Sequence, residues 1–324
     1  LVDFASTERI QLTIVGPEVP LVAGIVDEFQ AANLACFGPD KKAAQLEGSK
    51  SFSKAFLERH HIPTAEYVHF TNLDAAINYI NIKGAPIVIK ADGLAAGKGV
   101  VVALNKEEAI AAVIEMLDGN KFGIAGHSVV IEEFLVGEEA SFIVICDGQT
   151  PLPLASSQDH KARDDGDKGP NTGGMGAYSP APVVDDLMHA CIMREVIEPA
   201  VQGMRDEGMP YTGFLYAGLM ISDDGQAKVL EFNCRFGDPE SQVILMRLKS
   251  DLVELCTAAL QGQLHETKIE WDKRAALGVV MASSGYPDKA RNDDIINGLE
   301  NIQDANCKVF HAGTAVKNDA VVTA

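Results

Sequence analysis

Basic residues are scarce in this sequence of 324 residues, because 27 lysines and arginines stand against 46 aspartates and glutamates, for a formal net charge of −19. A general nucleic-acid binder needs a basic face, so the composition argues against that class of protein. Any phosphate site must therefore be built from locally clustered lysines and arginines. The acidic excess itself is typical of a solvated surface that aids solubility.

Paired cysteines and long apolar runs are also missing. Six cysteines occur, none of them in a Cys-x-x-Cys pair, which argues against a disulfide framework or a zinc site and favours a reduced cytoplasm. No apolar run approaches the length of a membrane span and no signal peptide is recognisable, so no membrane partner is expected. The chain opens at Leu1 and stops at Ala324 inside an expected strand, which suggests a fragment of a longer protein.

The two common phosphate-binding motifs are absent as well. A Walker A loop needs four residues between its glycine and Gly-Lys-Ser/Thr, but only three separate Gly93 from Gly97, and Lys98 is not followed by a hydroxyl. A dinucleotide fingerprint needs a third glycine that opens a helix, and a β-rich run follows Gly99 instead. A glycine-rich hairpin remains, with Lys90 and Lys98 at its ends. It is suited to closing over a polyphosphate, and a surface hairpin with solvated lysines is the alternative.

Apolar periodicity predicts a βαβ unit at the start of the chain, made of strand 12–15, helix 19–31 and strand 34–37, and hence a parallel sheet. Glu18 follows the first strand, where such sheets bind ligands; alternatively it is a helix N-terminal carboxylate favoured by the dipole. Lys50 lies in the first turn of the next predicted helix, where the macrodipole gives a cation no help. This placement weakly favours a functional lysine over a solvated one.

Residues 66–133 are predicted to form a compact unit of alternating strands and helices. This unit carries the glycine-rich hairpin, and it is small enough to move as a lid. It ends in a strand over 129–135, after which a hinge at Gly137 leads into a second strand. Exposed backbone at such a hinge can read an adenine edge, and a nearby glutamate can accept hydrogen bonds from ribose hydroxyls.

A long polar loop over 156–178 follows without obvious structure, and loops of this length are usually functional or disordered. Its segment Thr172-Gly-Gly-Met-Gly176 is a second backbone-rich cradle suited to an anion. His160 is a candidate base, although its neighbours Asp159 and Lys161 favour a polar loop contact instead.

Two strands over 213–221 and 228–233 are predicted to form a hairpin. Side chains alternate along an extended chain, so Glu231 and Asn233 share a face. A carboxylate and an amide oxygen are hard ligands suited to magnesium, which shares its other positions with substrate phosphates; an ordinary polar strand face is the alternative. Arg235 follows directly, and its planar guanidinium can match a phosphate or a carboxylate bidentately, which favours the metal site.

Taken in order, these segments resemble the ATP-grasp superfamily and, within it, the phosphoribosylamine–glycine ligase family of bacterial purine biosynthesis. The resemblance covers nearly the whole chain, and its most distinctive stretches are 169–180 and 231–240. The other segments that carry it are 16–21, 46–50, 89–99, 131–135 and 157–161. It implies an α/β (α+β) chain with a partial N-terminal parallel α/β domain, an ATP-grasp domain with a small lid subdomain, and a truncated C-terminal domain. The corresponding ranges are 1–48, 49–265 with its lid at about 66–133, and 266–324.

The resemblance also implies that the protein uses ATP with Mg²⁺ or Mn²⁺. Lys50 and Lys90 would hold the ATP phosphates, and Glu231 and Asn233 would ligate the metal. Further nucleotide contacts would come from the glycine loop, the hinge and a ribose-binding glutamate, with Glu138 a close competitor of Glu139 for that last role. These residues are Gly93, Gly97, Lys98, Gly99, Glu132, Glu133, Phe134, Leu135, Glu138 and Glu139.

The implied substrates are glycine and 5-phosphoribosylamine, joined through a glycyl phosphate by a monomer that binds no nucleic acid. Arg235 and Lys90 would be the catalytic residues. The residues that would shape the two substrate sites are Glu18, Arg235, Asp159, His160, Lys161, Thr172, Gly173, Gly174, Met175 and Gly176. Many ATP-grasp proteins carry a further acidic metal ligand on the preceding strand, and Tyr216-Ala-Gly-Leu219 contains none.

Two other interpretations stay open at this point. One is another ATP-grasp carboxylate–amine ligase, against which the segments 170–180 and 233–240 argue. The other is a nucleotide-binding fragment that binds ATP without ligating anything. A kinase or P-loop ATPase lacks its motif here.

Overall fold

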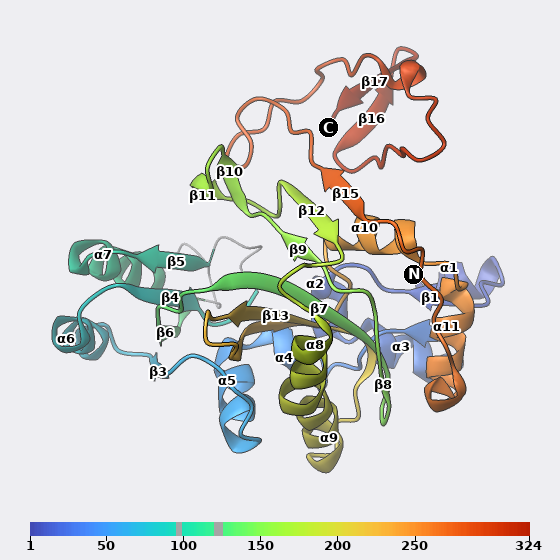
Figure 1. Ribbon diagram of the computed structural model, residues 1–324. Helices are drawn as coiled ribbons and strands as arrows, with labels where there is room; N and C mark the ends of the chain where they lie inside the picture. Colours follow the sequence, from blue (N-terminus) through green and yellow to red (C-terminus); the bar gives the residue numbers. More distant parts are fainter. Residues whose placement is uncertain (95–98, 120–125) are drawn as a thin grey trace.

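The computed structural model describes residues 1–94, 99–119 and 126–324. Its body is built on a sheet of four strands in the order β14-β13-β7-β8 (Figure 1). The strands are β7 (Glu138–Asp147), β8 (Pro151–Pro153), β13 (Thr212–Ile221) and β14 (Ala227–Asn233). β13 and β14 pair antiparallel, which confirms the predicted hairpin.

Helices cover both faces of this sheet. Figure 1 shows α8 (Asp186–Ile192) and α9 (Glu198–Asp206) beneath β7 and β13, joined by a π-helical turn over Met193–Ile197. The helical segment predicted over 183–207 therefore exists, but it is not one regular α-helix. Alternate residues of β13 divide between two cores: Leu215 packs into the core below, while Phe214 packs into the core that also contains residues of α10 (Glu240–Arg247) and α11 (Leu252–Leu260).

The N-terminal segment holds a short parallel pair, β1 (Thr13–Ile14) and β2 (Cys36–Phe37), as the βαβ pattern predicts. The single helix predicted over 19–31 is wrong, because α2 (Glu18–Ala23) and α3 (Ile25–Ala31) are separated by Gly24 at φ 98°. That left-handed conformation ends a helix and suits glycine. The helices α1 (Val2–Thr7), α4 (Gln45–Gly48) and α5 (Lys50–Arg59) complete the segment.

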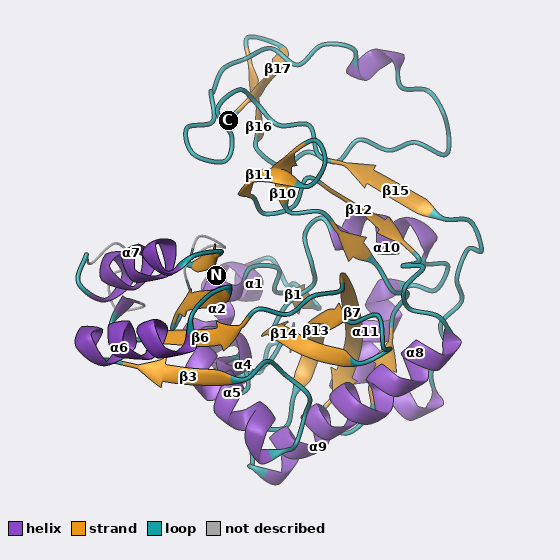
Figure 2. Cartoon of the chain, turned by 60° about the vertical axis from the view of Figure 1, so that its left-hand side comes forward, coloured by secondary structure: helices purple, strands orange, loops and turns teal. Residues whose placement is uncertain are grey.

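The predicted lid unit has its own sheet and its own core. Its strands lie in the order β3-β6-β4-β5, and its two helices pack with them around a separate apolar cluster. The elements are β3 (Tyr67–Phe70), α6 (Leu73–Lys83), β4 (Ile87–Ala91), β5 (Val100–Ala103), α7 (Lys106–Leu117) and β6 (Val129–Glu133). Figure 2 shows this unit at one side of the molecule, apart from the C-terminal hairpin.

The segment 156–178 contains short strands, so the prediction of a structureless loop is wrong. Its strands are too short to show an alternating pattern in sequence: β9 (Gln158–Asp159), β10 (Ala162–Asp164), β11 (Lys168–Asn171) and β12 (Gly176–Ser179). β12 pairs with β9 on one side and with β15 (Ala276–Val279) on the other.

The C-terminal segment ends in a hairpin of β16 (Thr314–Lys317) and β17 (Ala320–Thr323) that lies above the body in Figure 1. The described residues also include 3₁₀ turns at Leu264–Glu266 and Leu299–Asn301. Among the described residues, no helix combines the length and the apolar character needed to cross a lipid bilayer.

Candidate active site

Glu231 and Asn233 lie on one face of β14, opposite Gly218 and Tyr216 of β13. Burial alone would raise the pKa of the Glu231 carboxyl, but nearby cations outweigh it and hold the pKa below its usual range. These cations are Lys161, Lys90, Lys50 and Arg235. Residues predicted from separate segments of the sequence thus gather around one anionic centre.

Lys90 is buried at the end of β4 and reaches across to β14. Its Nζ atom donates to the carbonyl oxygen of Leu230 at 2.9 Å and lies 3.0 Å from Oε2 of Glu132. Lys50 begins α5 and donates to the carbonyl oxygen of Gly93 at 3.2 Å. Burial lowers the pKa of Lys50, and the charge of Lys90 adds to that effect, while Glu231 opposes it. Lys50 therefore contacts the start of the glycine loop, whereas Lys90 contacts β14 and Glu132.

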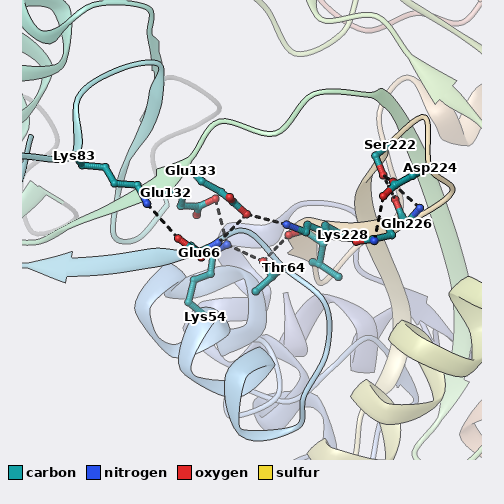
Figure 3. Close-up of polar contacts among 11 residues, drawn as sticks. Lys54, Thr64, Glu66, Lys83, Glu132, Glu133, Ser222, Asp224, Gln226 and Lys228 are labelled. Atoms are coloured by element: carbon teal, nitrogen blue, oxygen red, sulfur yellow. Dashed lines mark hydrogen bonds and ion pairs between the residues drawn. The ribbon is translucent and has the colours of Figure 1, made fainter.

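Glu132 forms ion pairs with two lysines at the junction of lid and body, and Figure 3 shows the one with Lys54. Its Oε2 atom lies 3.2 Å from Nζ of Lys54, in addition to its contact with Lys90, and all three side chains are buried. Oε1 of Glu132 is also buried, and no group in the described residues forms a hydrogen bond with it. Burial lowers the pKa of Lys54 to about 8, and Glu132 opposes that shift.

Lys54 is not among the site residues predicted from the sequence. It also donates to Oγ1 of Thr64 at 2.7 Å. A signal for it exists in the sequence. Lys54 falls three residues before Leu57 on the apolar face of α5, where a solvated lysine is out of place.

The hinge after β6 borders a small cavity. Glu133 forms an ion pair of 2.9 Å with Lys228 (Figure 3), and Phe134 is 37% exposed. The cavity has a volume of about 200 Å³. It is lined by Leu135, Val136, Met220, Ser222, Asp224, Gln226 and Lys228.

The two candidate ribose glutamates have different partners. Oε2 of Glu139 forms an ion pair of 3.1 Å with Lys161, whereas Oε2 of Glu138 accepts from Nε2 of Gln158 at 3.4 Å. The charges of Asp159, Glu139 and Glu231 raise the pKa of Lys161 although its burial opposes this. Glu139 is therefore linked to the Glu231 centre, and Glu138 is not.

Arg235 is held by two carboxylates from the N-terminal segment. Its Nε atom lies 3.4 Å from Oε2 of Glu18, and its Nη2 atom lies 3.7 Å from Oε1 of Glu47. Nη2 also donates to Oδ1 of Asn233 at 3.5 Å. Oε2 of Glu47 accepts from both N and Sγ of Cys234, at 2.7 and 2.9 Å. The sequence analysis assigned no role to Glu47.

The segment 172–176 does not present the predicted cradle of free N–H groups. Gly173 donates to Oη of Tyr286 at 3.4 Å, Gly174 to Oγ1 of Thr172 at 3.0 Å, and Met175 to the carbonyl oxygen of His160 at 2.7 Å. Thr172 and Gly176 complete the segment, with Gly176 in β12. Because those donors are satisfied internally, an anion cannot use them without rearrangement.

His160 is exposed, and its ring lies 5.5 Å from that of Tyr178, which suits the polar-contact interpretation better than the base. Gly99 closes the glycine loop by accepting from the backbone N–H of Ala91 at 2.8 Å. Gly97 and Lys98 lie outside the described residues.

The carboxylate oxygens of Glu231 and the amide oxygen of Asn233 fit a divalent cation that also binds phosphate oxygens. No hydrogen bond from the described residues occupies the Glu231 carboxylate, and the surrounding cations keep it ionised. Within the same part of the chain, no group of three or more histidine, cysteine, aspartate or glutamate side chains is arranged to hold a metal. A cation here would therefore depend on ligands supplied by the substrate.

Comparison with known proteins agrees with this geometry. Three family models match the chain: phosphoribosylglycinamide synthetase N domain over 1–47, ATP-grasp (A) domain over 48–241 and C domain over 276–324. Phosphoribosylamine–glycine ligase of Yersinia pestis is 63% identical over 324 residues, which are 100% of this chain and 76% of that protein. The enzyme of Escherichia coli K12 is 64% identical over 322 residues, covering 99% and 75%.

Solved structures show the same family relationship. Phosphoribosylamine–glycine ligase from Thermotoga maritima superposes with a TM-score of 0.77 at 34% identity, covering 92% of this chain and 74% of that one. A biotin carboxylase from Campylobacter jejuni, at 15% identity and a TM-score of 0.71 over 91% of this chain and 65% of that one, shares the fold alone. The chain belongs to the phosphoribosylglycinamide synthetase family, within the ATP-grasp fold.

Proposed function

We propose that this protein uses ATP to join glycine to 5-phosphoribosylamine, giving glycinamide ribonucleotide, ADP and phosphate in purine biosynthesis. Its family membership supports this reaction. The structural observation that carries it is the gathering of four cations around the carboxylate of Glu231. In a chain with a net charge of −19, such a cluster is suited to binding anionic substrates specifically.

The nucleotide is expected between the lid and the body. Lys50 and Lys90 bind its phosphates, and the glycine loop covers them. The buried Oε1 of Glu132 accepts no hydrogen bond from the part of the chain that the structure describes. The exocyclic amine of adenine would satisfy it, because buried acceptors are nearly always paired. The hinge backbone over 133–135 reads the rest of the adenine edge, and Glu139 binds the ribose hydroxyls.

Glu231 and Asn233 would hold Mg²⁺ or Mn²⁺, which when bound neutralises phosphate charge. The remaining positive charge comes from the chain itself. Lys90 and Arg235 stabilise the negative charge that develops on the transferring phosphoryl group.

The reaction proceeds in two steps. A carboxylate oxygen of glycine attacks the γ-phosphorus, the bond between that phosphorus and the β,γ-bridging oxygen breaks, and ADP leaves with the bond's electrons. The amine nitrogen of phosphoribosylamine then attacks the carbonyl carbon of the glycyl phosphate. The bond from that carbon to the phosphate oxygen breaks, phosphate leaves, and the nitrogen loses a proton as the amide forms. A closed lid protects the acyl phosphate from water.

The remaining assignments belong to the same proposal. Glu18, Arg235 and the segment from Asp159 to Gly176 shape the glycine and phosphoribosylamine sites. The chain acts as a monomer in the cytoplasm, and its domains extend over 1–48, 49–265 and 266–324.

The test is ADP release from ATP and magnesium with glycine and freshly prepared phosphoribosylamine, omitting each substrate in turn. Release that requires both substrates supports the proposal. Lys90→Ala should lower kcat/KM about a hundredfold to a thousandfold, whereas Lys83→Ala, which removes an exposed lysine of the lid, should leave it unchanged. Release with a different acid or amine would indicate another ATP-grasp ligase, and ATP binding without release would indicate a nucleotide-binding fragment.

A further inference from the structure

Glu132 carries both of its lysine partners on one carboxylate oxygen. The Nζ atoms of Lys54 and Lys90 lie 3.2 and 3.0 Å from Oε2. Oε1 is buried too, and it accepts no hydrogen bond from any residue that the structure describes. Because a buried acceptor is rarely left without a donor, this arrangement keeps one oxygen available for a ligand while the other holds two ammonium groups.

The register of the lid sheet explains why these groups meet. Glu132 of β6 lies directly opposite Val88 of β4, and Lys90 is two residues further along β4. Side chains alternate along a strand, so Glu132 and Lys90 share one face of the sheet. Ile131, next to Glu132, packs into the lid core on the other face. Lys54 reaches the polar face from α5 of the body, so the three side chains meet where lid and body join.

The two lysines differ in what else they can contact. Lys90 is expected to bind the nucleotide phosphates, which will draw on its positive charge. The other contacts of Lys54 are internal: its Nζ atom donates to Oγ1 of Thr64 at 2.7 Å (Figure 3) and lies 5.7 Å from the centre of the Tyr67 ring. Lys54 is therefore the cation that stays with Glu132 when a nucleotide is bound.

The charge of Glu132 decides what its open oxygen can recognise. An ionised carboxylate only accepts hydrogen bonds, whereas a protonated one can also donate. Opposite charges at close range favour the ionised form, and here two ammonium groups contact the same oxygen. An ionised Oε1 attracts an N–H donor and repels another acceptor. The cations around Glu132 therefore determine which base it prefers.

We propose that Lys54 makes nucleotide binding selective for a 6-aminopurine over a 6-oxopurine, because it holds Glu132 ionised with Oε1 as a pure acceptor. This inference rests on the proposed function and goes beyond it to a lysine that acts on the base only through Glu132. Lys54 is thus a positioning residue for base selection.

Loss of Lys54 changes the hydrogen-bonding character of Glu132. The carboxylate keeps one counterion, Lys90, which it then shares with the nucleotide phosphates. With less positive charge beside it, Glu132 takes up a proton more readily. The protonated carboxyl can donate to the oxo group of hypoxanthine, so the preference for the amino group weakens.

The test compares the binding of ADP with that of IDP, which carries an oxo group where ADP carries the amino group. Isothermal titration calorimetry in the presence of magnesium gives both Kd values. Wild-type protein should bind ADP about tenfold to a hundredfold more tightly than IDP, the range for one charged hydrogen bond. In Lys54→Met and in the less disruptive Lys54→Gln, the ratio of the two Kd values should fall to about threefold or less. Lys54→Arg keeps the charge and should retain a ratio within about threefold of wild type.

Phe56→Leu is the matched control. Phe56 is a fully buried residue of the same helix, so its truncation lowers stability without removing a charge. The variant should keep the wild-type ratio of Kd values, because general loosening of α5 weakens the binding of both nucleotides alike.

Two results would overturn the inference. One is a wild-type ratio in Lys54→Gln, which would show that the charge of Lys54 is not needed for base selection. The other is an equal fall of the ratio in Phe56→Leu, which would assign the effect to the stability of α5. Failure of the proposed function is distinguishable, because the two Kd values require neither glycine nor phosphoribosylamine. Wild-type protein would then still bind ADP selectively but would not release it from ATP in response to both substrates.

Discussion

Lys54 and Glu132 form a buried ion pair of 3.2 Å that joins helix α5 of the body to strand β6 of the lid. Lys54 also donates to Thr64, whose hydroxyl donates in turn to the carbonyl oxygen of Val229 at 2.6 Å. One lysine thus links the lid, the body sheet and the segment between them. Because Glu132 also contacts Lys90, the pair fixes the position of a predicted phosphate ligand.

Replacing Lys54 by methionine should destabilise the protein by about 3–5 kcal/mol, since it leaves Glu132 with one of its two buried counterions and Thr64 without its donor. Denaturation by urea, followed by the shift in midpoint, measures this change. The matched control is Lys83→Met, which breaks the exposed pair with Glu66 and should leave the urea midpoint nearly unchanged. Equal shifts in the two variants would show that the buried pair contributes no more than the surface one.

Asp92, between β4 and the glycine loop, fastens the lid to the start of α5. Its carboxylate accepts from the backbone N–H of Ser51 at 3.1 Å and from the hydroxyls of Ser51, Ser49 and Ser128 at 2.5, 3.1 and 3.1 Å. Burial would raise the pKa of Asp92, but these hydrogen bonds outweigh it and hold the pKa below its usual range. The ionised carboxylate is therefore favoured in the folded state.

The lowered pKa of Asp92 makes the stability of the fold depend on pH. A carboxyl with a lower pKa in the folded state stabilises the fold above the unfolded value of about 3.9, and this stabilisation is lost as the pH falls through the folded value. Asp92→Asn should be less stable than wild type by about 1–3 kcal/mol at pH 7, with the difference shrinking below about pH 4. Urea titrations from pH 7 to pH 3 measure it, with Asp118→Asn as the control for loss of a lid surface charge. A constant difference across the range would contradict the linkage.

The sequence carried enough information for most of the elements and for the shared face of Glu231 and Asn233, but not for contacts between distant segments. The strands of the lid have apolar runs long enough to be recognised, and alternation alone places Glu231 and Asn233 together. By contrast, Lys54 and Glu132 are 78 positions apart, and Glu47 and Cys234 are 187 apart. No local pattern encodes such pairs, because they depend on how separate units pack.

Local conformation accounts for the other differences. The helical periodicity over 19–31 continues through Gly24, and only the backbone angle there breaks the helix. In the segment 172–176, composition predicts free N–H groups, yet Tyr286, more than a hundred positions away, takes one of them. Sequence patterns thus identify which residues are suited to a site, whereas the fold decides which of their atoms stay available.

Glu47 is expected to position Arg235 and the residue that precedes it. Its Oε2 atom accepts from Cys234, and its Oε1 atom faces the guanidinium of Arg235. Glu47→Gln keeps a side chain of the same size but removes the charge, so Glu18 becomes the only ion-pair partner of Arg235 among the described residues. We expect kcat for ADP release to fall about tenfold, the loss of roughly one charged contact.

In this proposal Arg235 stabilises the charge that develops during phosphoryl transfer and shapes the substrate sites, and neither role is needed to bind ATP. The KM for ATP should therefore not change in Glu47→Gln. Cys234→Ser is the matched control, because it preserves the backbone donor and replaces the thiol by another donor. Steady-state kinetics with each substrate varied in turn separate the two effects. A wild-type kcat in Glu47→Gln would show that Glu18 alone suffices to hold the guanidinium.

Gly174 couples the segment 172–176 to the start of α10. Its φ is +129°, and a Cβ atom there would collide with Cδ of Pro239, a ring that cannot rotate away. Gly174→Ala should therefore destabilise the protein by more than about 1 kcal/mol and shift Pro239, which directly precedes Glu240. We expect kcat/KM for glycine to fall more than that for ATP.

Gly173→Ala is the natural comparison, since the atom nearest its Cβ is Oη of Tyr286 at 3.6 Å. This substitution should have little effect on stability or on either kcat/KM. Thermal unfolding and steady-state kinetics of both variants test this, and equal effects at the two positions would rule out the collision with Pro239 as the cause.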